Sequence, residues 1–141
     1  MTADKDLVQQ SYGACCLSPK FFDDFYAAFL ASSSEIAGKF VNTDMNRQKQ
    51  LLRDGITFMI MFYNGTAVGQ MKVKRLGESH AQDRMDIKPQ WYDLWVNALM
   101  KTIAQHDSKF SPALDRAWRT VLSKGIESMR RQYAVKTPVG A

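Results

Sequence analysis

Apolar residues recur at steps of three and four along most of this chain, and Pro and Gly fall between the segments that carry the pattern. Leu52, Ile56, Met59 and Tyr63 are one example. Such spacing places apolar side chains on one face of a helix, whereas a half-buried strand needs strict alternation, which is almost absent here. The pattern therefore predicts an all-α fold.

Local signals predict where the helices begin and end. Ser18-Pro19 and Ser111-Pro112 favour helix starts, because the Ser hydroxyl accepts from an unpaired amide and Pro needs no donor in the first turn. Thr43 or Asp44 is expected to cap another helix. The predicted helices cover about 3–14, the segment after Pro19, a short piece reaching Phe40, 45–63, a segment from Ala67 or Val68 to His80, 89–105 and 112–134. No repeat or linker interrupts them, so we expect one domain over 1–141, with a short frayed tail at 135–141.

Composition narrows the class of protein. The chain has 141 residues, 45% of them hydrophobic, which is typical of a folded soluble protein. No apolar run reaches the roughly 18 residues that would suggest a membrane span, and the polar start predicts no secretory signal. The two cysteines, Cys15 and Cys16, are adjacent and poorly placed for an ordinary disulfide, so we expect a cytoplasmic protein. The net charge of +5 comes without a recognition stripe, so no nucleic-acid partner is expected.

Three polar side chains fall on otherwise apolar helical faces: Tyr26, Gln48 and His80. Burying such groups costs free energy unless each finds a hydrogen-bond partner or a metal. Each alone has an ordinary interpretation, as a core aromatic, a residue at the edge of the stripe, or a hydrogen-bonded core histidine. Their order along the chain gives them a joint interpretation.

The three polar residues stand in a fixed order with several aromatic and apolar residues. Along the chain the order is Phe25-Tyr26, Phe40, Thr43-Asp44-Met45, Gln48, Leu76, His80 and Trp118. Leu76 lies one helical turn before His80, and Trp118 lies in the last predicted helix. In this order and register the chain resembles the globin family, specifically the bacterial single-domain haemoglobins. The resemblance covers nearly the whole chain. It implies a globin fold with helices packed around a haem pocket, and a non-covalent haem b as cofactor.

The resemblance makes His80 the proximal iron ligand. A neutral imidazole is the ligand that globins use, and its second ring nitrogen is expected to donate a hydrogen bond to the Leu76 carbonyl or the Ser79 hydroxyl. The other histidine, His106, closes a predicted helix and is expected to be a helix-terminus cation or a solvated surface residue. Beyond His80, the candidates for haem contact are Met85, which we take first, and Ile87, Trp91 and Tyr92.

On the distal side, the resemblance implies that Tyr26 and Gln48 donate hydrogen bonds to bound dioxygen, which carries partial negative charge. Phe40 would pack on the porphyrin face, and Leu52 would wall the distal side. A register shifted by one residue would instead turn Arg47 and Leu51 toward the pocket. Alternatively, Arg47 reaches a haem propionate.

These residues imply reversible binding of dioxygen and other diatomic gases at a five-coordinate ferrous haem. A distal Tyr and Gln are also what flavohaemoglobins use, so nitric oxide dioxygenation is implied as an activity, for which this chain would need a separate reductase. The alternatives are a gas or redox sensor that acts on a partner protein, and a helical module without haem, in which Tyr26, Gln48 and His80 would each need another partner.

Overall fold

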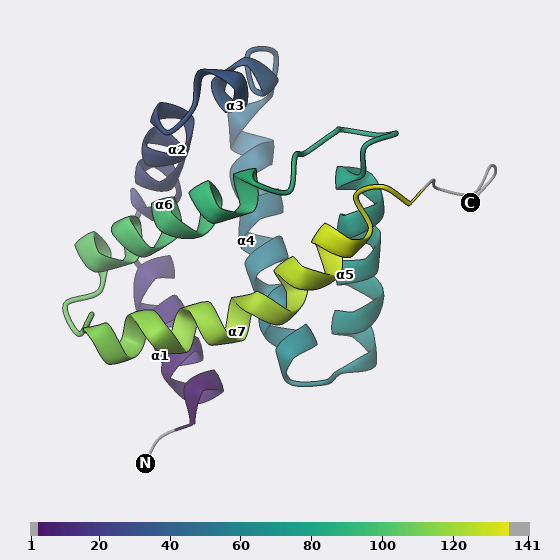
Figure 1. The fold of residues 1–141 in the computed structure, drawn as a ribbon. Coiled ribbons are helices and arrows are strands. Elements are labelled where there is room, and N and C mark those ends of the chain that lie inside the picture. Colours follow the sequence, from purple (N-terminus) through teal and green to yellow (C-terminus); the bar gives the residue numbers. More distant parts are fainter. Residues whose placement is uncertain (1–2, 136–141) are drawn as a thin grey trace.

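A computed structural model describes residues 3–135, and helices are the only regular secondary structure in this range. They are α1 (Asp4–Cys16), α2 (Phe21–Ala31), α3 (Ser34–Lys39), α4 (Met45–Tyr63), α5 (Ala67–His80), α6 (Trp91–His106) and α7 (Pro112–Arg131) (Figure 1). The all-α prediction is confirmed. Of the tail expected at 135–141, residues 136–141 lie outside the described residues.

Side-chain caps explain several of the helix starts. Asp44 rather than Thr43 caps α4, since its carboxylate accepts from the backbone nitrogens of Asn46 and Arg47. Ser111 caps α7 by accepting from the nitrogen of Leu114, as the Ser-Pro pair predicts. These caps satisfy amides that have no partner inside the helix, and they set the register of the residues that follow.

The expectation that Ser18 starts the second helix is wrong. Helix α2 begins at Phe21, and the residue before it, Lys20, makes no side-chain cap. The reason is that the Ser18 hydroxyl lies 2.7 Å from the Nδ1 atom of His106, at the end of α6. The Ser18 hydroxyl therefore makes a long-range contact with His106 and does not cap α2.

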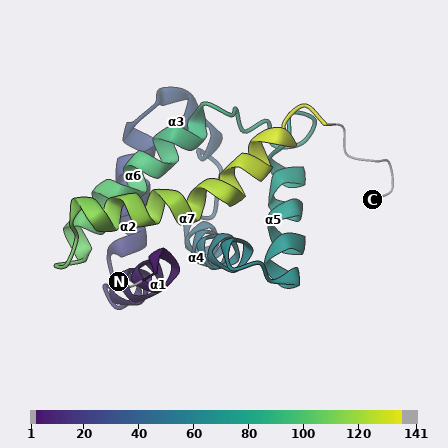
Figure 2. The same cartoon turned by 60° about the horizontal axis from the view of Figure 1, so that its bottom comes forward.

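The helices cross one another rather than forming a parallel bundle. In Figure 1, α4 and α5 run side by side, and α6 and α7 pass across in front of α4. Figure 2 shows α7 extending from the side of α1 and α2 to the side of α5, where its C-terminal end lies. Helix α7 contributes the most buried residues of any helix, including the fully buried Trp118. Helix α7 therefore packs against helices on both sides of the core, α1 on one side and α5 on the other.

Gly69 allows α4 and α5 to approach closely. A Cβ atom at this position would lie 2.4 Å from the backbone nitrogen of Phe62, a distance that real side chains do not show. Gly65 makes the turn before it, with a φ of 80° that favours glycine. The two glycines fix how the helix that ends at His80 packs against α4.

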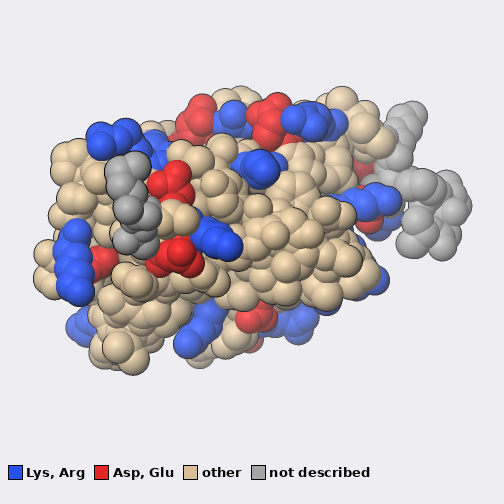
Figure 3. Space-filling model, turned by 90° about the horizontal axis from the view of Figure 1, so that it is seen from below, with Lys and Arg blue, Asp and Glu red and all other residues tan. Residues whose placement is uncertain are grey.

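The face seen from below carries charged side chains of both signs. Positive and negative side chains are interspersed there (Figure 3). Among the described residues, no helix combines the length and apolar character needed to span a bilayer.

Candidate functional site

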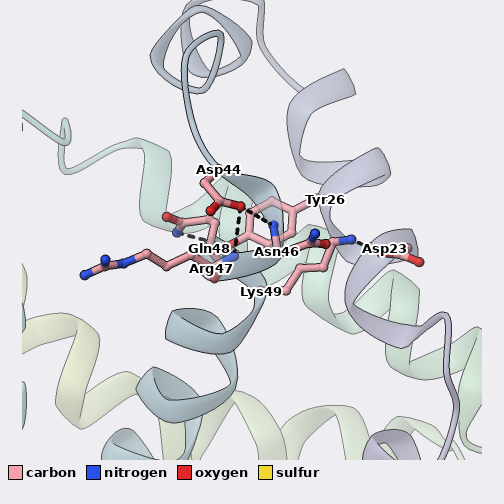
Figure 4. Close-up of polar contacts among 7 residues, drawn as sticks. All are labelled: Asp23, Tyr26, Asp44, Asn46, Arg47, Gln48 and Lys49. Atoms are coloured by element: carbon pink, nitrogen blue, oxygen red, sulfur yellow. Dashed lines mark hydrogen bonds and ion pairs between the residues drawn. The ribbon is translucent and has the colours of Figure 1, made fainter.

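Tyr26 and Gln48 form a hydrogen-bonded pair between α2 and α4. The Gln48 Nε2 atom donates to the Tyr26 hydroxyl at 3.1 Å, and that hydroxyl donates to the Gln48 backbone carbonyl at 3.4 Å. Figure 4 shows the Tyr26 ring directed from α2 toward the first turn of α4. Tyr26 is buried and Gln48 is half-buried. Both polar side chains lie on apolar stripes of the sequence, and each provides the other with a hydrogen-bond partner.

The structure distinguishes the two registers that the sequence left open for α4. Arg47 is exposed, and its side chain extends away from Tyr26 (Figure 4). Leu52 is buried at 8% exposure, whereas Leu51 is 50% exposed. The structure thus places Gln48 and Leu52 on the inward side of α4, and Arg47 and Leu51 on the outward side.

The Tyr26 hydroxyl keeps its proton at neutral pH. Burial raises the pKa of Tyr26 to about 12, and the hydrogen bond from Gln48 opposes that rise. A protonated phenol in a buried position can donate to a ligand that replaces the Gln48 carbonyl as its acceptor.

Phe40 adds an aromatic wall next to this pair. Its ring centroid lies 5.8 Å from that of Tyr26 and 6.3 Å from that of Phe29. Phe40 is half-buried and immediately follows α3, so it joins the corner between α3 and α4 to the aromatic residues of α2.

His80 ends α5 with its ring orientation fixed. Its Nδ1 atom lies 2.7 Å from the Leu76 carbonyl and 3.0 Å from the Ser79 hydroxyl. A carbonyl only accepts hydrogen bonds, so Nδ1 carries the hydrogen and Nε2 carries the lone pair. Within residues 3–135, Nε2 has no hydrogen-bond partner. This tautomer is the one that coordinates a metal through Nε2.

The electrostatic surroundings favour the same neutral form. Burial lowers the pKa of His80 from its usual 6.5, more than the hydrogen bond to the Leu76 carbonyl raises it. The imidazole is therefore neutral at pH 7 and available as a ligand.

The segment after His80 folds back on the end of α5. The backbone nitrogen of Ile87 donates to the His80 carbonyl at 3.0 Å, and that of Met85 donates to the Ser79 carbonyl at 3.2 Å. The Met85 side chain is 48% exposed, so its contact with haem remains a prediction.

The structure contradicts one of the two roles expected for His106, that of a solvated surface residue. His106 does close α6, but its side chain is only 13% exposed rather than solvated. Its Nδ1 atom contacts the Ser18 hydroxyl and its Nε2 atom contacts an Asp24 carboxylate oxygen, both at 2.7 Å. Because both nitrogens have partners, His106 joins α6 to the start of α2 and has no lone pair to offer a metal.

The residues present fit a haem. The chain supplies one neutral imidazole with an available Nε2 atom, two polar donors on other helices, and apolar or aromatic neighbours in Phe40 and Leu52. A non-covalent haem requires this combination of one strong axial ligand and an apolar pocket. In the sections below, the haem site is the short name for this candidate site, the surroundings of Tyr26, Phe40, Gln48, Leu52 and His80.

Sequence reasoning missed the polar contacts of two residues, Ser11 and Tyr133. Ser11 is buried, donates to Asp107 at 2.7 Å and accepts from the indole nitrogen of Trp118 at 2.9 Å. Tyr133, just beyond α7, donates from its hydroxyl to Asp86. Ser11 lies on the buried face that Val8, Tyr12 and Cys15 mark in α1, and this position was an available signal. Tyr133 falls within the last predicted helix, 112–134, and nothing in the sequence indicated its contact with Asp86.

Comparisons with known proteins agree with this geometry. The family model described as Globin matches residues 23–129. Among solved structures, the chain is similar to a Pseudomonas aeruginosa PAO1 protein described as structurally highly homologous to a human haemoglobin, with 45% sequence identity and a TM-score of 0.90. The match covers 93% of this chain and 98% of that one. No curated protein sequence matches.

Proposed function

Because the chain belongs to the globin family, it is a haem-binding globin, and we propose that it binds dioxygen reversibly at a five-coordinate ferrous haem b. The haem, held without a covalent bond, supplies an iron with one open coordination position. His80 is the proposed proximal ligand, since its Nδ1 hydrogen bond to Leu76 leaves Nε2 free to coordinate.

The observation that carries this proposal is the hydrogen-bonded pair of Tyr26 and Gln48. Two donors that already meet within a buried site need little rearrangement to donate together to a small, partially negative ligand. Tyr26 would exchange its acceptor, the Gln48 carbonyl at 3.4 Å, for the ligand. The pair should therefore retain dioxygen and slow its release.

The oxygen dissociation rate of the haem-loaded protein tests the distal assignment. A hydrogen bond to a charged acceptor contributes about 1.5–3 kcal/mol, so Tyr26→Phe should release oxygen roughly 10- to 100-fold faster. Gln48→Leu should also accelerate release, because it removes the second donor. Tyr63→Phe, at the far end of the same helix as Gln48, is the matched control and should release oxygen at the wild-type rate. Unchanged release in both distal variants would refute the assignment.

The same pair supports nitric oxide dioxygenation as a second candidate activity. In that reaction both atoms of dioxygen would join nitric oxide to give nitrate, with one electron supplied by a ferrous haem, and a separate reductase would have to return that electron. Nitric oxide consumption is the measurement, with and without an added ferredoxin or flavin reductase. Sustained consumption only with the reductase supports dioxygenation, whereas a single turnover in both cases supports a carrier.

The cytoplasm is the proposed location, because Cys15 and Cys16 are both free thiols and such thiols persist in reducing compartments.

The alternative to an oxygen-binding role is a sensor that acts on a partner protein. A change of oligomeric state on binding gas would support that alternative.

A further inference from the structure

One side chain connects α3 to the segment that follows α5. Lys39 is the last residue of α3, and its Nζ atom donates to the backbone carbonyl of Met85 at 3.0 Å. The two residues are 46 positions apart in the sequence. No other hydrogen bond or ion pair involves the Lys39 ammonium within the described residues.

The two ends of this contact belong to different parts of the haem site. Lys39 directly precedes Phe40, whose ring packs against Tyr26. Met85 is bonded through its own backbone nitrogen to the carbonyl of Ser79, the residue before His80. The Lys39 contact therefore links the corner that carries Phe40 to the segment that carries the proximal ligand.

Neither end is strongly held by apolar packing. Helix α3 has six residues and buries only Ile36. Residues 82–85 of the connection are all exposed. Elements with few buried contacts open at low free-energy cost, so a single polar contact between them has a large share in keeping them together.

We propose that Lys39 is a positioning residue that keeps these two segments together around the haem and thereby slows haem loss. It acts through the Met85 carbonyl rather than by touching the cofactor. The proposal requires haem binding but not the proposed dioxygen chemistry, so each can fail without the other.

The test is the rate at which the ferric haem-loaded protein loses haem to excess apomyoglobin. Lys39→Met keeps the length of the side chain and removes the donor, and it should lose haem about three- to tenfold faster, as expected for one net hydrogen bond. Lys39→Arg retains a donor and should stay close to wild type. Lys74→Met, an exposed lysine on α5, makes the same charge change away from Met85 and should have no effect.

A second haem distinguishes the carbonyl contact from a direct pairing with the cofactor. The dimethyl ester of haem has no propionate charges, so an ammonium that acted on a propionate would lose its effect. The proposal expects Lys39→Met to accelerate loss of the ester by the same factor as loss of ordinary haem. Equal rates for wild type and Lys39→Met would overturn it, and so would an acceleration seen only with the free propionates.

Discussion

The backbone carbonyl of Tyr133 accepts a hydrogen bond from the backbone nitrogen of Gln82 at 2.8 Å. The Tyr133 hydroxyl also donates to Asp86, a residue with a φ of 53°, in the left-handed region that non-glycine residues seldom occupy. Tyr133, just beyond α7, thus holds the connection after His80 at two points. Gly77, three residues before His80, lies against the residue that follows α7. A Cβ atom on Gly77 would lie 2.3 Å from the side-chain nitrogen of Gln132, so the end of α7 also packs closely on α5.

We expect Tyr133→Phe to weaken haem retention. The hydrogen bond to Asp86 raises the pKa of Tyr133, so the phenol remains the donor at neutral pH. Removing the hydroxyl frees Asp86 to leave its strained conformation and loosens the backbone that positions His80. Outer partners of metal ligands typically change affinity by 10- to 100-fold, and this part-buried contact, which does not touch His80 itself, should lie near the lower limit, at about tenfold. Haem transfer to apomyoglobin measures the effect.

Tyr63→Phe is the matched control for Tyr133→Phe. It removes a hydroxyl from a half-buried tyrosine whose ring stays packed under the Lys124 ammonium, 5.3 Å from the ring centroid. If both variants retained haem as wild type does, the hydrogen bond from the Tyr133 hydroxyl to Asp86 would have no role in holding the segment after His80.

The proximal assignment of His80 predicts a chemical rescue. His80→Gly should reduce haem affinity by more than the roughly 100-fold that outer contacts reach, because it removes the ligand itself. Added imidazole should restore a Soret band, since a free imidazole can occupy the space that the side chain leaves. His106→Gly is the comparison and should retain haem without imidazole, because both nitrogens of His106 bind other residues. Full haem retention by His80→Gly would contradict the assignment.

Acid should destabilise the apoprotein through His80. Its pKa is lowered in the folded chain, mainly by burial, whereas in the unfolded chain it is about 6.5. Between these two values the unfolded state binds more protons, so stability rises with pH in this window and falls as the solution is acidified. Urea unfolding from about pH 5 to pH 7.5 measures the slope. His80→Gln should show a shallower slope, and an identical slope would exclude this contribution.

The sequence predicted helices best where apolar periodicity and a cap agreed. Helix α4 begins one residue after Asp44 and ends at Tyr63, where its apolar stripe ends, as expected. The second helix was misplaced because Ser18 serves a contact with His106, which is 88 residues away and leaves no local signal. Likewise, the predicted end of the last helix near Ala134 moved to Arg131, since Tyr133 turns to meet Gln82.

The candidate site was predictable for a different reason. Tyr26, Gln48 and His80 stood out because each is polar on an apolar stripe, and the order of the three matched a known family. Lys39 is an exposed lysine and Tyr133 is an aromatic residue within the last predicted helix, so neither carries such a contrast. Their roles depend on which backbone carbonyl or carboxylate the fold brings near them, and only the three-dimensional arrangement supplies that information.

Ser11 should be more important for stability than its size suggests. Its hydroxyl joins the Trp118 indole to Asp107, and all three side chains are buried. Asp107 also accepts from the backbone nitrogen of Lys109 at 3.0 Å, so the cluster ties α1 and α7 to the turn between α6 and α7. In Ser11→Ala, the indole donor and one carboxylate oxygen lose their partner. Each unsatisfied buried group costs about 1–3 kcal/mol, which predicts a total loss of about 2–6 kcal/mol in the free energy of unfolding.

Urea unfolding of the Ser11→Ala apoprotein measures this loss, with Ser123→Ala as control. Ser123 is an exposed serine of α7 whose hydroxyl bonds only to the Thr120 carbonyl one turn earlier, so its replacement should change stability by less than about 0.5 kcal/mol. The Ser11 variant should also shift the fluorescence of the buried Trp118, because its indole nitrogen loses its acceptor. Equal stabilities for the two variants would show that water or a rearranged neighbour satisfies the indole and the carboxylate once the hydroxyl is gone.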